Sequence, residues 1–94
     1  MTKMQLLQLN AIANKIENLE VTKSEEKILE IVNIIAEERK AQKLSQEALA
    51  QKANLTKNTI SRIETFVSEP TLSALVQILQ ALNLDIIISP ISNP

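Results

Sequence analysis

Apolar residues recur every three or four positions along most of this chain, which is the period of a helix buried on one face. The pattern predicts five helices, at about residues 3–19, 23–42, 46–53, 57–64 and 72–82. The run Leu84-Asp85-Ile86-Ile87-Ile88 follows the last helix and is closed by Pro90. Because it is rich in β-branched residues and begins after a helix stop, it predicts a short strand. The expected fold is therefore mostly α.

The ends of the expected helices carry local stop and start signals. Thr22 with Glu25 three residues later is a capping-box pattern at the start of the second helix. Hydroxyl side chains precede the next three helices, at Ser45, Thr56 and Thr71. Asn54 and Asn83 stand where the chain leaves a helix, and Asn tolerates positive φ better than most residues.

A single strand needs a partner for its backbone groups, and no other segment of this chain has a strand pattern. The economical solution is pairing with the same strand of a second copy, which predicts a homodimer. The alternative is that the segment packs as an irregular apolar tail. The residues expected to form the dimer strand are Leu84, Ile86, Ile87 and Ile88.

The composition excludes several kinds of chemistry. The chain has 94 residues, enough for one compact domain, and contains no Cys, no His and no Gly. Thiolate and imidazole catalysis, Cys/His metal sites and glycine-rich phosphate loops are therefore excluded, and no spacing of acids suggests a carboxylate metal site. We expect no catalytic residues, no metal, no cofactor and no enzyme activity.

Charge and hydropathy indicate the surroundings of the protein. The formal net charge is −1, but residues 37–64 hold 6 basic side chains against 4 acidic ones. This modest central excess is weak support for a nucleic-acid partner. No run of 18 or more apolar residues and no signal-peptide pattern occurs, so we expect a cytoplasmic protein without a membrane span.

Residues 46–63 combine the features that a steep crossing of two short helices requires. Ala50 supplies the small side chain at the crossing, Asn54 the left-handed turn residue, and Thr56 the cap of the second helix. Apolar residues face inward on both helices: Leu49, Ala53, Leu55, Ile60 and Ile63. Their joint spacing predicts a helix-turn-helix whose second helix enters the major groove of DNA.

The stretch from Ile35 to Leu82 resembles the Cro/phage-repressor type, or XRE family, of helix-turn-helix domains. The resemblance is carried by L-S-Q-E-A-L-A at 44–50, T-I-S-R-I-E at 59–64 and E-P-T-L-S-A-L at 69–75. The ending A-L-N-L-D-I-I-I-S-P at 81–90 is most similar to the HipB-type antitoxin regulators, in which a C-terminal strand pairs across the dimer. The resemblance implies a lambda-repressor-like bundle at 23–83, between an N-terminal helical extension at 1–22 and a strand and tail at 84–94.

The resemblance also implies roles for particular side chains. Arg39 and Glu64 match a pair that forms an internal salt bridge in relatives. Gln46 is expected to contact a DNA phosphate, with Ser45, Thr56 and Thr59 as secondary phosphate contacts. The residues expected to meet base edges are Lys57, Asn58, Ser61 and Arg62.

Two positions depart from the family pattern. Asn54 stands where relatives usually have Gly, and the loop at 65–69 has Glu69 where relatives often place residues that touch phosphate. We expect Phe66 and Val67 in this loop to pack on the core, the alternative being a contact with a partner protein.

Taken together, the resemblance implies a homodimeric repressor that binds a palindromic double-stranded operator. A more specific hypothesis is an antitoxin that autoregulates an operon with a HipA-like kinase toxin. The alternatives are an XRE repressor without a toxin, and an interaction module that has lost DNA binding. For the stripe Leu9, Ile12, Ile16 and Leu19 of the first helix, packing within the chain and a role in dimerisation or toxin binding both stay open.

Overall fold

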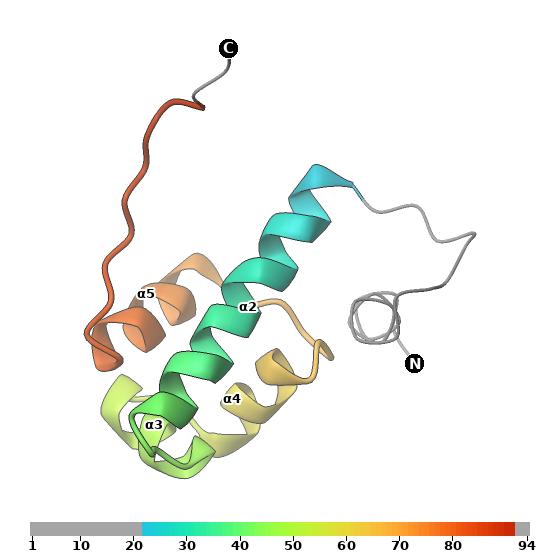
Figure 1. Cartoon of the computed structure of the whole chain (residues 1–94). Helices are drawn as coiled ribbons and strands as arrows, with labels where there is room; N and C mark the ends of the chain where they lie inside the picture. The colour runs from blue at the N-terminus through green and yellow to red at the C-terminus, as the bar shows by residue number, and fades with distance from the viewer. Residues whose placement is uncertain (1–21, 92–94) are drawn as a thin grey trace.

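A computed structural model of the protein describes residues 22–91, which contain four helices and no strand. The helices are α2 at Lys23–Ala41, α3 at Gln46–Ala53, α4 at Lys57–Glu64 and α5 at Leu72–Ala81. Helix α3 contacts both α4 and α5, and α2 contacts α4 (Figure 1). The helices expected from the periodicity after residue 22 are confirmed to within a residue or two at each end.

Each helix begins at the hydroxyl residue that the sequence indicates. Thr22 accepts a hydrogen bond from the Glu25 amide, and the Glu25 carboxylate accepts one from the Thr22 amide, which completes the capping box. Ser45, Thr56 and Thr71 each accept a bond from the amide three residues on. These bonds satisfy backbone donors that the first turn of a helix leaves without a partner, so the four starts are determined locally.

Each of the four described helices is followed within two positions by a residue in the left-handed region, although the chain has no Gly. These residues are Lys43, Asn54, Phe66 and Asn83, with φ between 58° and 63°. In each case this residue and the next donate backbone bonds to carbonyls of the last turn, which is the Schellman arrangement. After three of the four, the next residue is a leucine that packs on the core: Leu44, Leu55 and Leu84. That packing helps to offset the steric cost of a left-handed residue with a Cβ.

The core is aliphatic apart from Phe66 and draws on every described helix. Its buried members are Val32, Ile35, Leu49, Ala50, Ala53, Ile60, Ile63, Phe66, Ile78, Leu79 and Leu82. No buried polar or charged residue occurs among residues 22–91. Because burial of apolar surface is the main favourable contribution to folding, this cluster holds α4 in place through Ile60 and Ile63.

Three expectations need correction or fall outside the structure. The first predicted helix, 3–19, lies outside the described residues, so four helices rather than five are seen. The strand predicted at 84–88 is absent, because ladder bonds need a second strand and one copy of residues 22–91 supplies none. Phe66 is buried as expected, but Val67 stays exposed, since only Phe66 points into the core.

Replacing Lys43 by Gly should stabilise the fold. Lys43 is exposed and has φ 59°, so the change removes Cβ strain without removing a buried side chain. We expect the free energy of unfolding to rise by about 0.5–1 kcal/mol, after the greater chain entropy of Gly in the unfolded state is allowed for. Urea denaturation followed by circular dichroism measures this. Lys43→Ala, which keeps the Cβ, is the matched control and should leave stability nearly unchanged; an equal gain in both variants would refute the argument.

Candidate nucleic-acid interface

Helices α3 and α4 form the helix-turn-helix. Asn54, at φ 58° and ψ 42°, ends α3 in the left-handed conformation, and Thr56 begins α4 two residues later. Ala50 and Ala53 are almost completely buried, so small side chains allow the two helices to approach closely. Leu55 in the turn packs against the core. The tight turn therefore fixes the direction in which α4 leaves the bundle.

Helix α4 has two faces of different chemistry. Ile60 and Ile63 point into the core. Lys57, Asn58 and Arg62 are exposed, while Ser61 is partly buried on the same outer side. Within residues 22–91 no ion pair involves Lys57 or Arg62. The structure thus brings together all four residues expected to contact bases on one helix and leaves both cations available.

The charge at the start of α4 does not stabilise this helix. Lys57 is its first residue, where the partial positive charge of a helix N-terminus disfavours a cation, and its first turn contains no acid. By contrast, α2 has Glu25 and Glu26 in its first turn. The positive end of α4 is therefore reinforced rather than neutralised, which suits an anionic ligand at a small cost in helix stability.

The hydroxyl groups at the helix starts keep one proton for a ligand. Thr56 Oγ1 accepts from the Thr59 amide at 3.1 Å and lies 2.8 Å from Thr59 Oγ1. Two hydroxyls carry two protons and their mutual bond uses one, so the pair can donate the other outward. Ser45 Oγ accepts from the Ala48 amide at 3.0 Å, which leaves its own O–H free to donate. Capping and phosphate contact are compatible at these residues.

Arg39 joins α2 to α4 and to the turn before α3. Its Nε and Nη2 donate to the two oxygens of the Glu64 carboxylate at 2.7 Å and 2.9 Å, and its Nη1 donates to the Leu44 carbonyl at 2.8 Å. The side chains of Arg39 and Glu64 are only 11% and 7% exposed. The hydrogen bond to Glu64 raises the pKa of Arg39 and outweighs the lowering by desolvation; the carboxylate charge adds to the rise.

Gln46 is held by the same pair. Its Nε2 donates to Glu64 Oε1 at 3.2 Å, so the side chain expected to grip a phosphate is first oriented by the ion pair. One amide N–H and the side-chain oxygen stay available. The sequence did not predict this bond or the bond from Arg39 to the Leu44 carbonyl, because the spacing of the bonded residues matches no local hydrogen-bonding motif.

Other expected residues lie elsewhere. Leu84, Ile86, Ile87 and Ile88 follow α5 and belong to the segment that leaves the bundle away from α4 (Figure 1). The described residues contain no cluster of acids that could hold a metal ion. None of the described helices is both long and apolar enough to span a membrane.

With this geometry in place, comparison with known families is informative. The helix-turn-helix family model HTH_3 matches residues 35–88, more than half of the chain. The chain belongs to this family. The HTH_3 family consists of DNA-binding domains of the XRE type, so α3 and α4 form a DNA-binding helix-turn-helix.

One curated relative is similar over part of the chain. The chain is 44% identical over 52 residues to "Uncharacterized HTH-type transcriptional regulator y4dL" of Sinorhizobium fredii (strain NBRC 101917 / NGR234). The alignment covers 55% of this chain and 26% of that relative. The chain therefore matches about a quarter of the relative's length.

Breaking the ion pair should destabilise the domain. Arg39→Met leaves the Glu64 carboxylate nearly buried without a countercharge, and we expect a loss of about 3 kcal/mol in the free energy of unfolding. The double variant Arg39→Met/Glu64→Leu removes the orphaned charge and should recover most of this loss. Urea denaturation measures both.

The exposed pair Lys27–Glu30 provides the control. Its side chains are well exposed, so Lys27→Met should change stability by less than about 0.5 kcal/mol. A double variant no more stable than Arg39→Met alone would show that the loss comes from packing and not from the carboxylate.

Proposed function

We propose that this chain is a sequence-specific DNA-binding transcription regulator that represses by inserting α4 into the major groove. The observation that carries the proposal is the outer face of α4, where Lys57, Asn58 and Arg62 are exposed beside a buried Ile60–Ile63 face. Family membership supports DNA as the ligand, and the similar protein of Sinorhizobium fredii is named a transcriptional regulator.

The side chains on this face have the donors and acceptors that base edges require. Lys57 and Arg62 suit the O6 and N7 acceptors of guanine, and Asn58 can pair with N6 and N7 of adenine. Ser61 can donate to or accept from either kind of base. Either cation can instead contact a phosphate, and the titration below distinguishes the two roles.

Phosphate contacts are proposed for the starts of α3 and α4. Gln46, Ser45 and the Thr56–Thr59 pair each keep a donor, and the amides of a helix N-terminus point toward an anion. Such contacts set the register of the protein on the duplex and supply most of the salt-dependent affinity.

We further propose a cytoplasmic homodimer on a palindromic operator. The support is the segment after α5, where Ile87 and Ile88 are 85% and 92% exposed in one copy. Pairing of Leu84–Ile88 with the same segment of a second copy would satisfy its backbone and cover these side chains. The two recognition helices would then enter successive major grooves about 34–36 Å apart.

A finer proposal is that the regulator is a HipB-type antitoxin whose partner is a HipA-like kinase toxin. It rests on the ending A-L-N-L-D-I-I-I-S-P, part of which lies within the family match at residues 35–88. Affinity purification from the source cells tests it: failure to recover a protein encoded beside this gene would contradict it. In that case the remaining proposal would be a phage- or host-type repressor without a toxin partner.

A second candidate is an interaction module without DNA binding. The net charge of −1 and the exposed Glu69 in the loop after α4 favour it, because an acid near the backbone of DNA repels phosphate. It predicts no affinity for any duplex.

The first test is a binding titration against the DNA upstream of this gene, at two salt concentrations and beside an unrelated duplex. We expect tighter, salt-sensitive binding to the upstream DNA. If Arg62 contacts a base, Arg62→Ala should cost about 1–3 kcal/mol on the preferred sequence and relax specificity at one position. Equal weakening on all sequences would mark a phosphate contact, and equal affinity of the native chain for both duplexes would contradict the proposal.

Charge reversal at two helix starts provides the matched control. Lys57 and Lys23 are both exposed first residues of helices, so replacing either by Glu should stabilise the fold by about 0.3–1 kcal/mol through the helix dipole. Only Lys57→Glu should abolish binding. Loss of binding in Lys23→Glu as well would show that the overall charge, and not the α4 face, controls affinity.

The dimer is tested at Ile88. We expect Ile88→Asp to raise the dimer dissociation constant at least about tenfold in sedimentation equilibrium, because it would place a carboxylate among the apolar side chains that pairing covers. Leu72→Asp is the control, since Leu72 is 74% exposed but lies on α5, outside the segment. An unchanged dimer dissociation constant in Ile88→Asp would show that the dimer contact lies elsewhere.

A further inference from the structure

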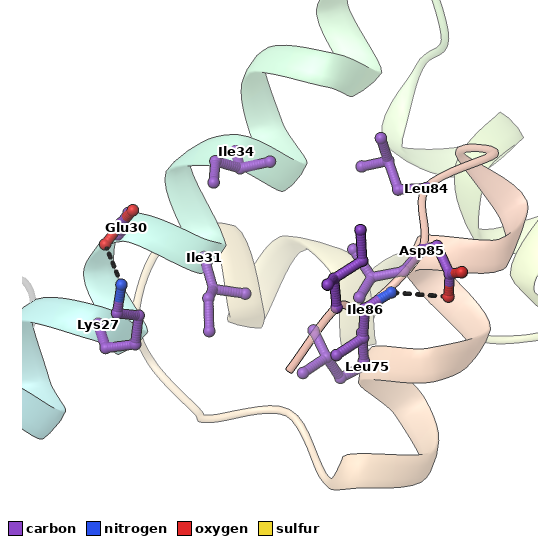
Figure 2. A pocket seen from close by; sticks show the side chains of 10 residues that line it. Lys27, Glu30, Ile31, Ile34, Leu75, Leu84, Asp85 and Ile86 are labelled. Atoms are coloured by element: carbon purple, nitrogen blue, oxygen red, sulfur yellow. Dashed lines mark hydrogen bonds and ion pairs between the residues drawn. The ribbon is translucent and has the colours of Figure 1, made fainter. Parts of the chain in front are cut away.

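An apolar groove of about 390 Å³ runs between the first half of α2, α5 and the segment that follows α5. Figure 2 shows Ile31 and Ile34 of α2 facing Leu75, Leu84 and Ile86 across it. Charged residues stand only at the rim, at Lys27, Glu30 and Asp85. The groove is therefore a site for apolar side chains and not for an ionic ligand.

The DNA-binding face does not account for this groove. Its lining includes no residue of α3 or α4. Its α2 wall, Lys27–Ile34, also precedes residue 35, where the family match begins. Ile34 is 46% exposed on this wall, so residues 22–91 leave part of its apolar side chain uncovered.

We propose that the N-terminal segment of the same chain covers the groove: residues 3–19 turn back at 20–22 and pack their apolar stripe along α2. The stripe consists of Leu9, Ile12, Ile16 and Leu19, which share one face if the segment is helical. Residues 1–21 lie outside the described structure; their sequence and their attachment to α2 support the proposal.

The point of attachment favours this occupant. Thr22 is the extended N-cap of α2, with φ −77° and ψ 160°, so the helix begins at Lys23 and does not continue back into the preceding segment. Three residues suffice to join two antiparallel helices. A helix over 3–19 would be about 25 Å long and would run beside α2 past Ile31 and Ile34. Leu9 lies about as many positions before residue 21 as Ile34 lies after it. In two antiparallel helices joined at 20–22, these two residues would therefore be neighbours.

Covalent linkage gives the segment an advantage over any separate molecule. A short linker holds its ends together at an effective concentration on the order of millimolar, far above that of a second copy in dilute solution. The proposal is independent of DNA binding. The groove and the proposed dimer strand share Leu84, Ile86 and Ile87, and only Ile88 of that strand lies outside the lining. A second copy is therefore the competing occupant that the test has to distinguish.

Disulfide trapping tests the proposal in the full chain, which has no native Cys to interfere. Leu9→Cys/Ile34→Cys is the test pair, and Ile12→Cys/Ile31→Cys is a second pair in the same register. Asn10→Cys/Ile34→Cys is the matched control, since residue 10 lies next to residue 9 along the chain but on the polar side of the stripe. Circular dichroism of each reduced variant confirms that it folds.

We expect the two test pairs to form a monomer-size disulfide at least about tenfold faster than the control, at a rate independent of protein concentration. A dimer-size product that rises with concentration would assign the groove to a second copy and overturn the proposal. Equal rates in test and control pairs would also overturn it. A variant with native DNA affinity and no selective disulfide would refute this inference while leaving the proposed function intact.

Discussion

Arg39 holds three parts of this small domain to one another. One guanidinium donates to both oxygens of Glu64 and to the Leu44 carbonyl, and Glu64 in turn accepts from Gln46. The network therefore links α2, the start of α3 and the end of α4. An eight-residue helix such as α4 is too short to be stable alone, so its position depends on this pair and on its buried isoleucines.

The same dependence explains why α4 can be suited to binding rather than to its own stability. Lys57 at its first position opposes the helix dipole, and its outer residues form no ion pair within the described chain. Isolated helices favour the reverse arrangement, with acids first. Here the bundle supplies the stability, and the surface of α4 remains electropositive at the end that would meet a phosphate-rich duplex.

The absence of Gly shapes the rest of the fold. Four helix ends adopt the left-handed conformation on residues with a Cβ, and the residue after three of them is a leucine that packs on the core. Each turn thus combines local strain with a tertiary contact that offsets it. The ends of the helices are consequently coupled to the packing of the core, which keeps the turn between α3 and α4 well defined without the flexibility that Gly would add.

The sequence alone determined the features that depend on short spacings. Helix period, the four N-caps, the left-handed Asn54 and Asn83, and the helix-turn-helix could all be predicted, because their partners lie within a few residues. The Arg39–Glu64 pair was implied only by family resemblance, since 25 positions separate its members. Only the tertiary structure decided that Lys43 and Phe66 would be left-handed, that Val67 would stay exposed and that Gln46 would bond to Glu64. It also decided that residues 84–88 form no strand in one copy, because a ladder needs a partner strand that residues 22–91 do not contain.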